Sequence, residues 1–239
     1  MPKLSIIIPA YNEEKRLPTT LQSVSDYLKK QNYSWEVIVA DNASTDGTGR
    51  IAEEWSKKDK AFKHLVVHEA GKGATIKRAM ERAVGEYRLF MDADNATTLD
   101  HIEFFWPHLE GGYDVVIGSI EVAGSTIEEK AGWHRRFLGK LAKLIIRFVA
   151  LPGIMDSQRG FKCFSKRSAE IVFKKQTIGR WGFDIEILLI SRRNGFKIKE
   201  VPVQWKNLGE SKVTLGAYVS TFIDLFKIKL NDLAGKYKA

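Results

Sequence analysis

Residues 87–94 read YRLFMDAD, a short apolar run that ends at Met91 and is followed at once by Asp92 and Asp94. Its length and its aromatic and aliphatic side chains predict a strand. The same pattern, a short apolar run with polar residues after it, recurs on both sides of this stretch. The other predicted strands cover residues 4–8, 35–40, 62–67 and 113–117.

The segments between these runs have helical periodicity. Apolar residues recur three or four positions apart at Leu17, Leu21, Val24 and Leu28, at Ile51 and Trp55, and at Ile76, Met80 and Val84. Strands that alternate with helices predict an α/β fold, with a mostly parallel central sheet and helices on both faces. Such sheets bind ligands at the carboxyl ends of their strands.

Composition and length exclude several classes of protein. The chain has 239 residues, of which 44% are hydrophobic and 28% charged, so disordered, collagen-like and coiled-coil structures are excluded. A single cysteine, Cys163, excludes a disulfide scaffold and is expected to be a buried apolar residue. The first apolar run stops at Pro9, too short for a signal peptide, and no apolar stretch reaches the ~18 residues of a membrane span. We therefore expect a cytoplasmic chain that does not cross a membrane.

Charge divides the chain near residue 126. Residues 1–126 hold 15 Lys and Arg against 19 Asp and Glu, whereas residues 127–239 hold 23 against 10. The acidic part suits metal carboxylates and is a poor surface for nucleic acid, and the basic part suits anionic lipid headgroups or phosphates. We expect one domain over residues 1–239, in which residue 126 separates two regions.

Polar clusters follow three of the predicted strands, at Pro9–Glu14, Asp41–Asp46 and Asp92–Asp94. The spacing of Asp92 and Asp94 can present oxygen ligands to a hard divalent cation, although two such acids also occur as solvated turn residues. Asp41 has an equal alternative as a cap of the next helix. For Asn42, Ser44, Thr45 and Asp46 the capping role is favoured.

Gly71-Lys72-Gly73 precedes a predicted helix, so its lysine and backbone N–H groups can receive a phosphate. It is not a Walker loop, because Ala74 stands where Ser or Thr would hold magnesium.

The order of these motifs resembles the family 2 glycosyltransferases of the GT-A fold. The later segments 153–162 and 180–186, and Trp205 with residues 209–212, are similar to the branch that glucosylates dolichyl phosphate, with the mannosyl-transferring enzymes as its neighbours. The resemblance runs from about residue 4 to the C-terminus, and the ordered set is more specific than any one motif.

The resemblance implies an inverting transfer of glucose from UDP-glucose to a polyprenyl phosphate. The implied nucleotide-sugar site comprises Pro9, Ala10, Tyr11, Asn12, Glu13, Asp41, Lys72, Asp92 and Ala93. Asp92 and Asp94 would hold Mg²⁺ or Mn²⁺, and Asp94 would thereby be catalytic. Asp184 or Glu186 occupies the place of an acid/base carboxylate; an equal alternative is that it orients Arg180 or the acceptor lysines through ion pairs.

One departure from the family pattern concerns the acceptor. Relatives commonly carry arginine after Gly118-Ser119, where this chain has Ile120. We therefore expect the acceptor phosphate to bind to cations elsewhere, at Arg135, Arg136, Arg159 or Lys212.

Two segments of the basic region have the pattern of membrane-surface helices. One has apolar residues at Trp133, Phe137, Leu138, Leu141, Leu144, Ile145 and Phe148. The other covers residues 215–233, where Phe222, Ile223, Phe226 and Leu230 oppose Lys227 and Lys229. Amphipathicity alone also fits a surface helix packed on the core, but a polyprenyl acceptor favours a peripheral position at the cytoplasmic face of a membrane.

Other functions stay open from the sequence alone. The donor could be GDP-mannose, or the acceptor could be soluble. A remote alternative is a non-catalytic nucleic-acid-binding protein that uses the basic region, but no RRM, KH or helix-turn-helix signature supports it, so no nucleic-acid partner is expected.

Overall fold

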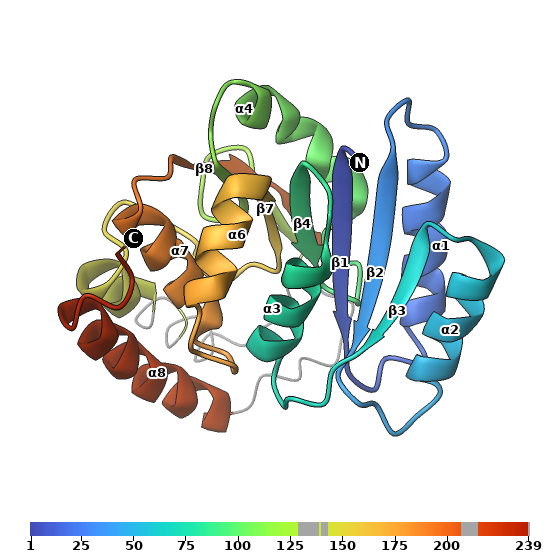
Figure 1. The fold of residues 1–239 in the computed structure, drawn as a ribbon. Coiled ribbons are helices and arrows are strands. Elements are labelled where there is room, and N and C mark those ends of the chain that lie inside the picture. Colours follow the sequence, from blue (N-terminus) through green and yellow to red (C-terminus); the bar gives the residue numbers. More distant parts are fainter. Residues whose placement is uncertain (129–138, 140–142, 207–214, 239) are drawn as a thin grey trace.

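The computed structural model describes residues 1–128, 139, 143–206 and 215–238. Its centre is a seven-stranded sheet of order β3-β2-β1-β4-β7-β5-β8 (Figure 1). The strands are β1 (Leu4–Ala10), β2 (Trp35–Asp41), β3 (Phe62–Val66), β4 (Tyr87–Met91), β5 (Val115–Ser119), β7 (Phe161–Ser165) and β8 (Ile198–Pro202). All neighbours are parallel except β7, which lies antiparallel between β4 and β5. Two short strands, β6 (Thr126–Glu128) and β9 (Gln204–Lys206), form a separate parallel pair.

Helices cover both faces of the sheet, because alternate strand residues point to opposite sides. Ile6 and Ile8 pack in one apolar cluster with α1 (Leu17–Leu28), α2 (Thr48–Lys58), η1 (Leu99–Phe104) and α4 (Trp106–Glu110). Ile7 belongs to the opposite cluster, which includes α3 (Lys72–Arg82), the helical segment 143–149, α6 (Lys166–Lys175), α7 (Phe183–Arg193) and α8 (Leu215–Leu233).

The predicted α/β fold with a mostly parallel sheet is confirmed, and the five predicted strands correspond to β1–β5. The helix predicted to include Val84 ends earlier, at Arg82, and the Val84 N–H donates to the buried Glu36 carboxylate. Strands β7 and β8 were not predicted, and they bring residues from beyond position 126 into the same sheet. Cys163 is free and fully buried in β7, as expected.

Segment 215–233 is a helix, α8, as predicted. Part of the first predicted membrane-surface helix lies outside the described residues, namely Trp133, Phe137, Leu138 and Leu141. Among the helices that the structure describes, none combines the length and the apolar character that a membrane span requires.

Candidate active site

The loops after β1 and β2 are joined by hydrogen bonds at the carboxyl edge of the sheet. The strands run in parallel register, with Ala10 opposite Asp41. The Asn12 N–H donates to Ser44 Oγ at 3.0 Å, and Asn12 Oδ1 accepts from the Thr45 N–H at 2.9 Å. Asn12 has a positive φ of 52°, a conformation that asparagine tolerates well. The two loops therefore form one rigid wall of the site.

The second loop shows which of the predicted capping residues act as caps. Asp46 accepts the Thr48 N–H at the start of α2, at 2.9 Å, as expected. Asn42 does not cap α2: its amide nitrogen donates to the carbonyls of Val67 and Glu69, and its oxygen accepts the Gly71 N–H at 3.0 Å. Asn42 thus connects the β2 loop to the glycine that precedes Lys72.

Asp41 lies at the base of this wall and is almost fully buried. Its Oδ1 accepts the Ser44 N–H at 3.0 Å, and its Oδ2 lies 3.8 Å from His64 Nε2. A side chain at Gly49 would come within 2.9 Å of Asp41 Oδ2. Asp41 supports its own loop and is not a cap of α2.

Lys72 joins the β4 loop to the start of α3. Its amine lies 2.5 Å from Asp92 Oδ1. Burial lowers the pKa of Lys72, but the nearby carboxylates of Asp92 and Asp184 outweigh this and raise it. Gly71, at φ 119°, permits the close approach of the chain to the Gly179 carbonyl, where a Cβ would overlap that oxygen. Lys72 is therefore held as a cation beside the strand-end aspartates.

Asp92 and Asp94 fit a divalent cation by their chemistry. Burial raises the pKa of Asp94, and the negative charge of Asp92 raises it further. Two carboxylates that repel each other in a desolvated place are stabilised by a cation. No group of three or more potential metal-ligating side chains occurs among the described residues. Mg²⁺ typically takes one or two carboxylates and completes its shell with water and substrate phosphates, so two aspartates are sufficient.

A buried ion pair between Lys162 and Asp184 lies close to Lys72 and Asp92. Lys162 of β7 is fully buried, and its amine contacts Asp184 Oδ1 of α7 at 2.5 Å, the carbonyl of Arg159, and the ring of Phe90. Burial raises the pKa of Asp184, and the charges of Lys162 and Lys72 oppose that rise. Asp184 therefore belongs to the same charge network as Lys72 and Asp92.

Glu186 lies two residues after Asp184 in α7, and its contacts are structural. It accepts hydrogen bonds from the backbone N–H groups of Thr177 and Ile178, from the Thr177 hydroxyl and from the Tyr237 hydroxyl. It is completely buried. Glu186 thus joins α7 to the loop after α6 and to the C-terminal segment. These contacts favour a structural role for Glu186 over the predicted acid/base role, and they also differ from an ion pair with Arg180.

Arg159 is the predicted acceptor cation that the structure describes; Arg135, Arg136 and Lys212 lie outside the described residues. Its Nε lies 3.1 Å from Asp156 Oδ2, and its guanidinium stacks 4.7 Å from the centre of the Trp205 ring. Asp156 is buried; burial raises its pKa, but Arg159 and Lys143 outweigh this and lower it. Its Oδ2 also accepts the N–H of Ile120, the residue that replaces the expected arginine.

Gly160 connects Arg159 to the aspartates. Its carbonyl accepts the Asp92 N–H at 3.1 Å, and a Cβ at Gly160 would overlap the Asp92 carboxylate. The structure thus brings together the predicted residues Lys72, Asp92, Asp94 and Asp184, with Arg159 one residue from the contact. It adds Gly160, Lys162 and Trp205, which lie in segments that carry the family resemblance but to which the sequence analysis gave no individual role. A lysine within the apolar run FKCFS was a further signal.

The fold and the site define the class. A mostly parallel sheet, two interlocked loops at its carboxyl edge, and an Asp-Ala-Asp triplet beside a lysine form a glycosyltransferase of the GT-A fold. The chain belongs to Glycosyl transferase family 2, whose family model matches residues 5–173.

Comparisons with individual proteins agree with this class. The chain is 33% identical to a dolichyl-phosphate beta-glucosyltransferase of Trichomonas vaginalis, over 98% of this chain and 75% of the relative. It is 30% identical to the dolichyl-phosphate beta-glucosyltransferase of Homo sapiens, over 99% of this chain and 78% of the relative. Among solved structures, glucosyl-3-phosphoglycerate synthase of Mycobacterium tuberculosis, in complex with Mn²⁺, UDP-glucose and phosphoglyceric acid, superposes with a TM-score of 0.70 at 17% identity, covering 95% of this chain and 80% of that one. This last similarity shows the fold.

Proposed function

We propose that this enzyme transfers glucose from UDP-glucose to a polyprenyl phosphate of the dolichyl type, with inversion at the anomeric carbon. The observation that carries the proposal is the ion pair of Lys72 with Asp92, beside Asp94, at the sheet edge. The relatives that match this chain over nearly its whole length are dolichyl-phosphate beta-glucosyltransferases.

The donor would lie along the carboxyl edge of the sheet. We assign the nucleoside to Pro9, Ala10, Tyr11, Asn12, Glu13 and Asp41, and the diphosphate to Lys72 and the turn that contains Ala93. Asp92 and Asp94 would hold Mg²⁺ or Mn²⁺. When bound, such a cation stabilises the negative charge that develops on the leaving diphosphate. The cation of Lys72 acts in the same direction.

The acceptor phosphate supplies its own nucleophile. A phosphate monoester is largely dianionic at neutral pH, because its second pKa is about 6. One of its oxygens forms the bond to the anomeric carbon as the bond from that carbon to the UDP oxygen breaks. No strong general base is needed, which agrees with the engagement of Asp184 by Lys162 and of Glu186 by its four donors. Arg159, oriented by Asp156 and Trp205, is our candidate for holding the acceptor phosphate.

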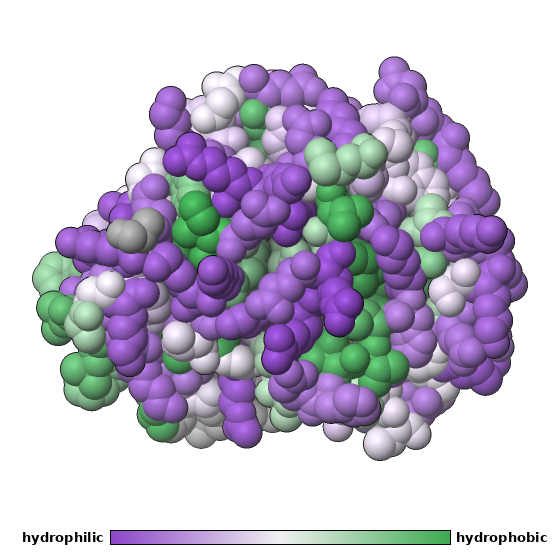
Figure 2. Space-filling view, in the orientation of Figure 1, coloured by the Kyte–Doolittle hydropathy of each residue, from purple (hydrophilic) through white to green (hydrophobic). Residues whose placement is uncertain are grey.

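We also propose a peripheral position at the cytoplasmic face of a membrane. On α8, Leu225 and Ile228 face the core, whereas Phe222, Ile223, Phe226 and Leu230 are exposed. Phe226 is 67% exposed, and Phe148 of segment 143–149 is 89% exposed. Figure 2 shows apolar residues gathered at the end of the molecule where these helices lie. An outward apolar face of this kind suits a lipid surface.

Product analysis tests the proposal. Purified enzyme is incubated with UDP-glucose or GDP-mannose, each combined with a polyprenyl phosphate or a soluble phosphorylated acceptor, with and without EDTA. We expect glucosyl polyprenyl phosphate with a new β linkage, only from UDP-glucose, and loss of product in EDTA and in Asp94→Asn. Transfer of mannose would show that the donor is GDP-mannose. Full activity in EDTA would show that the mechanism needs no metal ion.

A further inference from the structure

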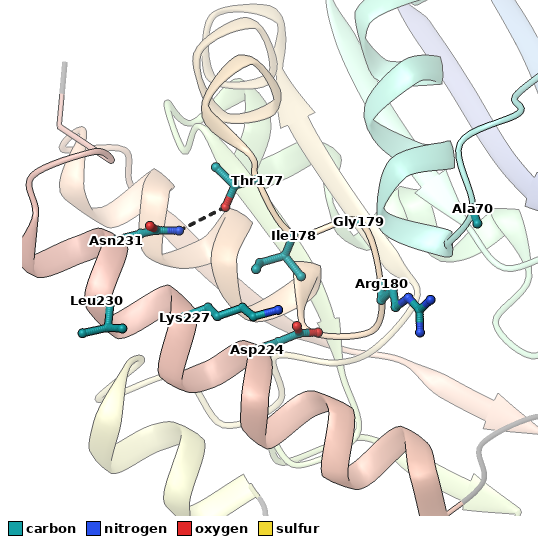
Figure 3. Close-up of a pocket in the computed structure, with 9 residues that line it drawn as sticks. All are labelled: Ala70, Thr177, Ile178, Gly179, Arg180, Asp224, Lys227, Leu230 and Asn231. Atoms are coloured by element: carbon teal, nitrogen blue, oxygen red, sulfur yellow. Dashed lines mark hydrogen bonds between the residues drawn. The ribbon is translucent and has the colours of Figure 1, made fainter.

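The structure has a cavity of about 510 Å³ whose lining includes neither Asp92 nor Asp94. Its walls are α8, the loop after α6, and Ala70 of the segment that leads into α3 (Figure 3). The carbonyl of Gly179, on the loop wall, accepts the Ala74 N–H of α3 at 2.9 Å, so this wall also supports the helix that carries Lys72.

Two cations line this cavity from opposite elements. Arg180 comes from the loop and Lys227 from α8 (Figure 3). Within the described part of the chain, neither has a carboxylate within ion-pair distance. Asp224, also in the lining, is committed elsewhere, because its Oδ2 accepts the Gly182 N–H at the start of α7, at 3.2 Å. The cavity thus presents two side-chain cations and one carboxylate that already has a partner.

Neutral hydrogen-bonding groups complete the polar lining. The Asn231 amide donates to the Thr177 hydroxyl at 3.2 Å, which joins α8 to the loop (Figure 3). Thr177 is in turn held by Glu186. The two cationic walls are therefore fixed relative to each other before any ligand arrives, which lowers the entropic cost of binding.

The exposed apolar face of α8 begins at the edge of the cavity. Leu230 belongs to the cavity lining and is also one of the exposed apolar residues, and Phe226 directly precedes Lys227 in the helix. A ligand that combines an anionic head with an apolar chain matches this arrangement, since its head would meet the cations while its chain stays beside Phe226 and Leu230.

We propose that the cavity between α8 and the loop 176–180 binds the phosphate group of a membrane lipid through Arg180 and Lys227. The inference rests on the proposed membrane position and not on glucosyl transfer. A polyprenyl phosphate and an anionic phospholipid carry the same chemistry, and the experiment distinguishes them. The site fixes how the enzyme is oriented on the membrane and keeps α8 beside the wall that supports Lys72.

Vesicle sedimentation without any nucleotide sugar tests the site. The full chain is mixed with phosphatidylcholine vesicles that contain either phosphatidylglycerol or a polyprenyl phosphate, at low salt. Lys227→Met and Arg180→Gln keep much of the side-chain volume. The control, Lys174→Met, removes one exposed charge from α6, none of whose residues lines the cavity. We expect each cavity variant to bind about tenfold more weakly, the effect of one lost charge-assisted contact, and Lys174→Met to bind like the wild type.

The two vesicle types identify the ligand. A loss confined to polyprenyl phosphate vesicles assigns the site to the acceptor lipid, and a loss on both assigns it to lipid phosphate in general. Equal losses in all three variants, or in none, overturn the proposal. Calorimetric titration with inorganic phosphate compares anion binding by the wild type and by the folded cavity variants, which we expect to bind phosphate more weakly. These binding measurements do not depend on turnover, so they would be the same for an enzyme with a different donor or acceptor. The membrane position is tested separately by Phe226→Ser. If this variant binds vesicles as well as the wild type does, the membrane position itself is contradicted.

Discussion

Gly160 is the place where β7 meets the strand-end aspartates. The absence of a side chain there allows the Asp92 carboxylate to occupy its position, because a Cβ would overlap it. The Asp92 N–H is also tied to the Gly160 carbonyl at 3.1 Å, so the backbone cannot easily move away. The position of Asp92, a proposed metal ligand, therefore depends on a residue 68 positions later in the chain.

We expect Gly160→Ala to lower glucosyl transfer by about 100-fold, because a misplacement of roughly 1 Å has an effect of that size. The strand should persist, since alanine is compatible with it. Turnover and Mn²⁺-dependent UDP binding are measured together with thermal unfolding. Wild-type turnover in the alanine variant would show that Asp92 tolerates displacement and is not positioned by this contact.

The two carboxylates of α7 are expected to respond differently to neutral substitution. Glu186→Gln places an amide N–H₂ opposite backbone donors, so we expect the free energy of unfolding to fall by about 2–3 kcal/mol, with turnover per folded molecule nearly unchanged. Asp184→Asn leaves the buried amine of Lys162 without its counter-charge, so we expect turnover to fall as well. Urea unfolding and kcat are compared for both variants. Loss of turnover without loss of stability in Glu186→Gln would restore the acid/base role.

At the scale of elements, α8 has apolar residues on two sides. Leu225 and Ile228 attach it to the core, while Phe226 points outward. Asp224 fixes the helix by accepting an N–H at the start of α7. An outward-facing residue of α8, such as Phe226, can therefore be replaced without removing the contacts that attach the helix to the core.

We expect Phe226→Glu to weaken binding to anionic vesicles by about 10–100-fold, since burial of a phenylalanine contributes about 1.5–3 kcal/mol. Phe148→Glu should act in the same direction. The control is Phe104→Glu, which alters another exposed phenylalanine, in the acidic region on η1. Vesicle sedimentation is the measurement. If Phe226→Glu unfolds the chain, or if Phe104→Glu has the same effect, α8 is not a membrane contact.

Local patterns explain why some elements were predictable and others were not. The runs that became β1–β5 are apolar in themselves, and the polar clusters after β1, β2 and β4 predicted the candidate site without knowledge of the fold. β8, with the sequence IKEVP, has no such run, and β7 includes Lys162, whose burial depends on Asp184, 22 residues away. Contacts such as Gly160 with Asp92 arise because β7 is inserted antiparallel between β4 and β5. Such pairing between distant segments has no local signature in the sequence.

At the scale of the whole molecule, the proposed donor residues and the proposed lipid contacts come from different regions of the chain. The proposed donor residues lie at or after the ends of β1, β2, β3 and β4, in the acidic region. The proposed lipid contacts come from α8 and segment 143–149, in the basic region. Arg159 lies two residues before the start of β7, the strand that joins the two regions within the sheet. Its guanidinium is oriented by Asp156 and Trp205.

This arrangement predicts that acceptor use can be damaged while donor binding is preserved. We expect Arg159→Ala to lower transfer to polyprenyl phosphate by about 10–100-fold, the effect of one lost charge-assisted contact of roughly 1.5–3 kcal/mol. UDP-glucose affinity should stay within about twofold. The matched control is Arg167→Ala, because Arg167 on α6 also stacks on an aromatic ring, that of Phe196, away from the aspartates. Calorimetry with UDP-glucose, alongside turnover, compares the variants. If Arg159→Ala loses affinity for UDP-glucose, this arginine binds the nucleotide diphosphate and not the acceptor. If turnover is unchanged, Arg159 is not part of the site, because a guanidinium that positions a reacting phosphate cannot be lost without slowing the attack of that phosphate.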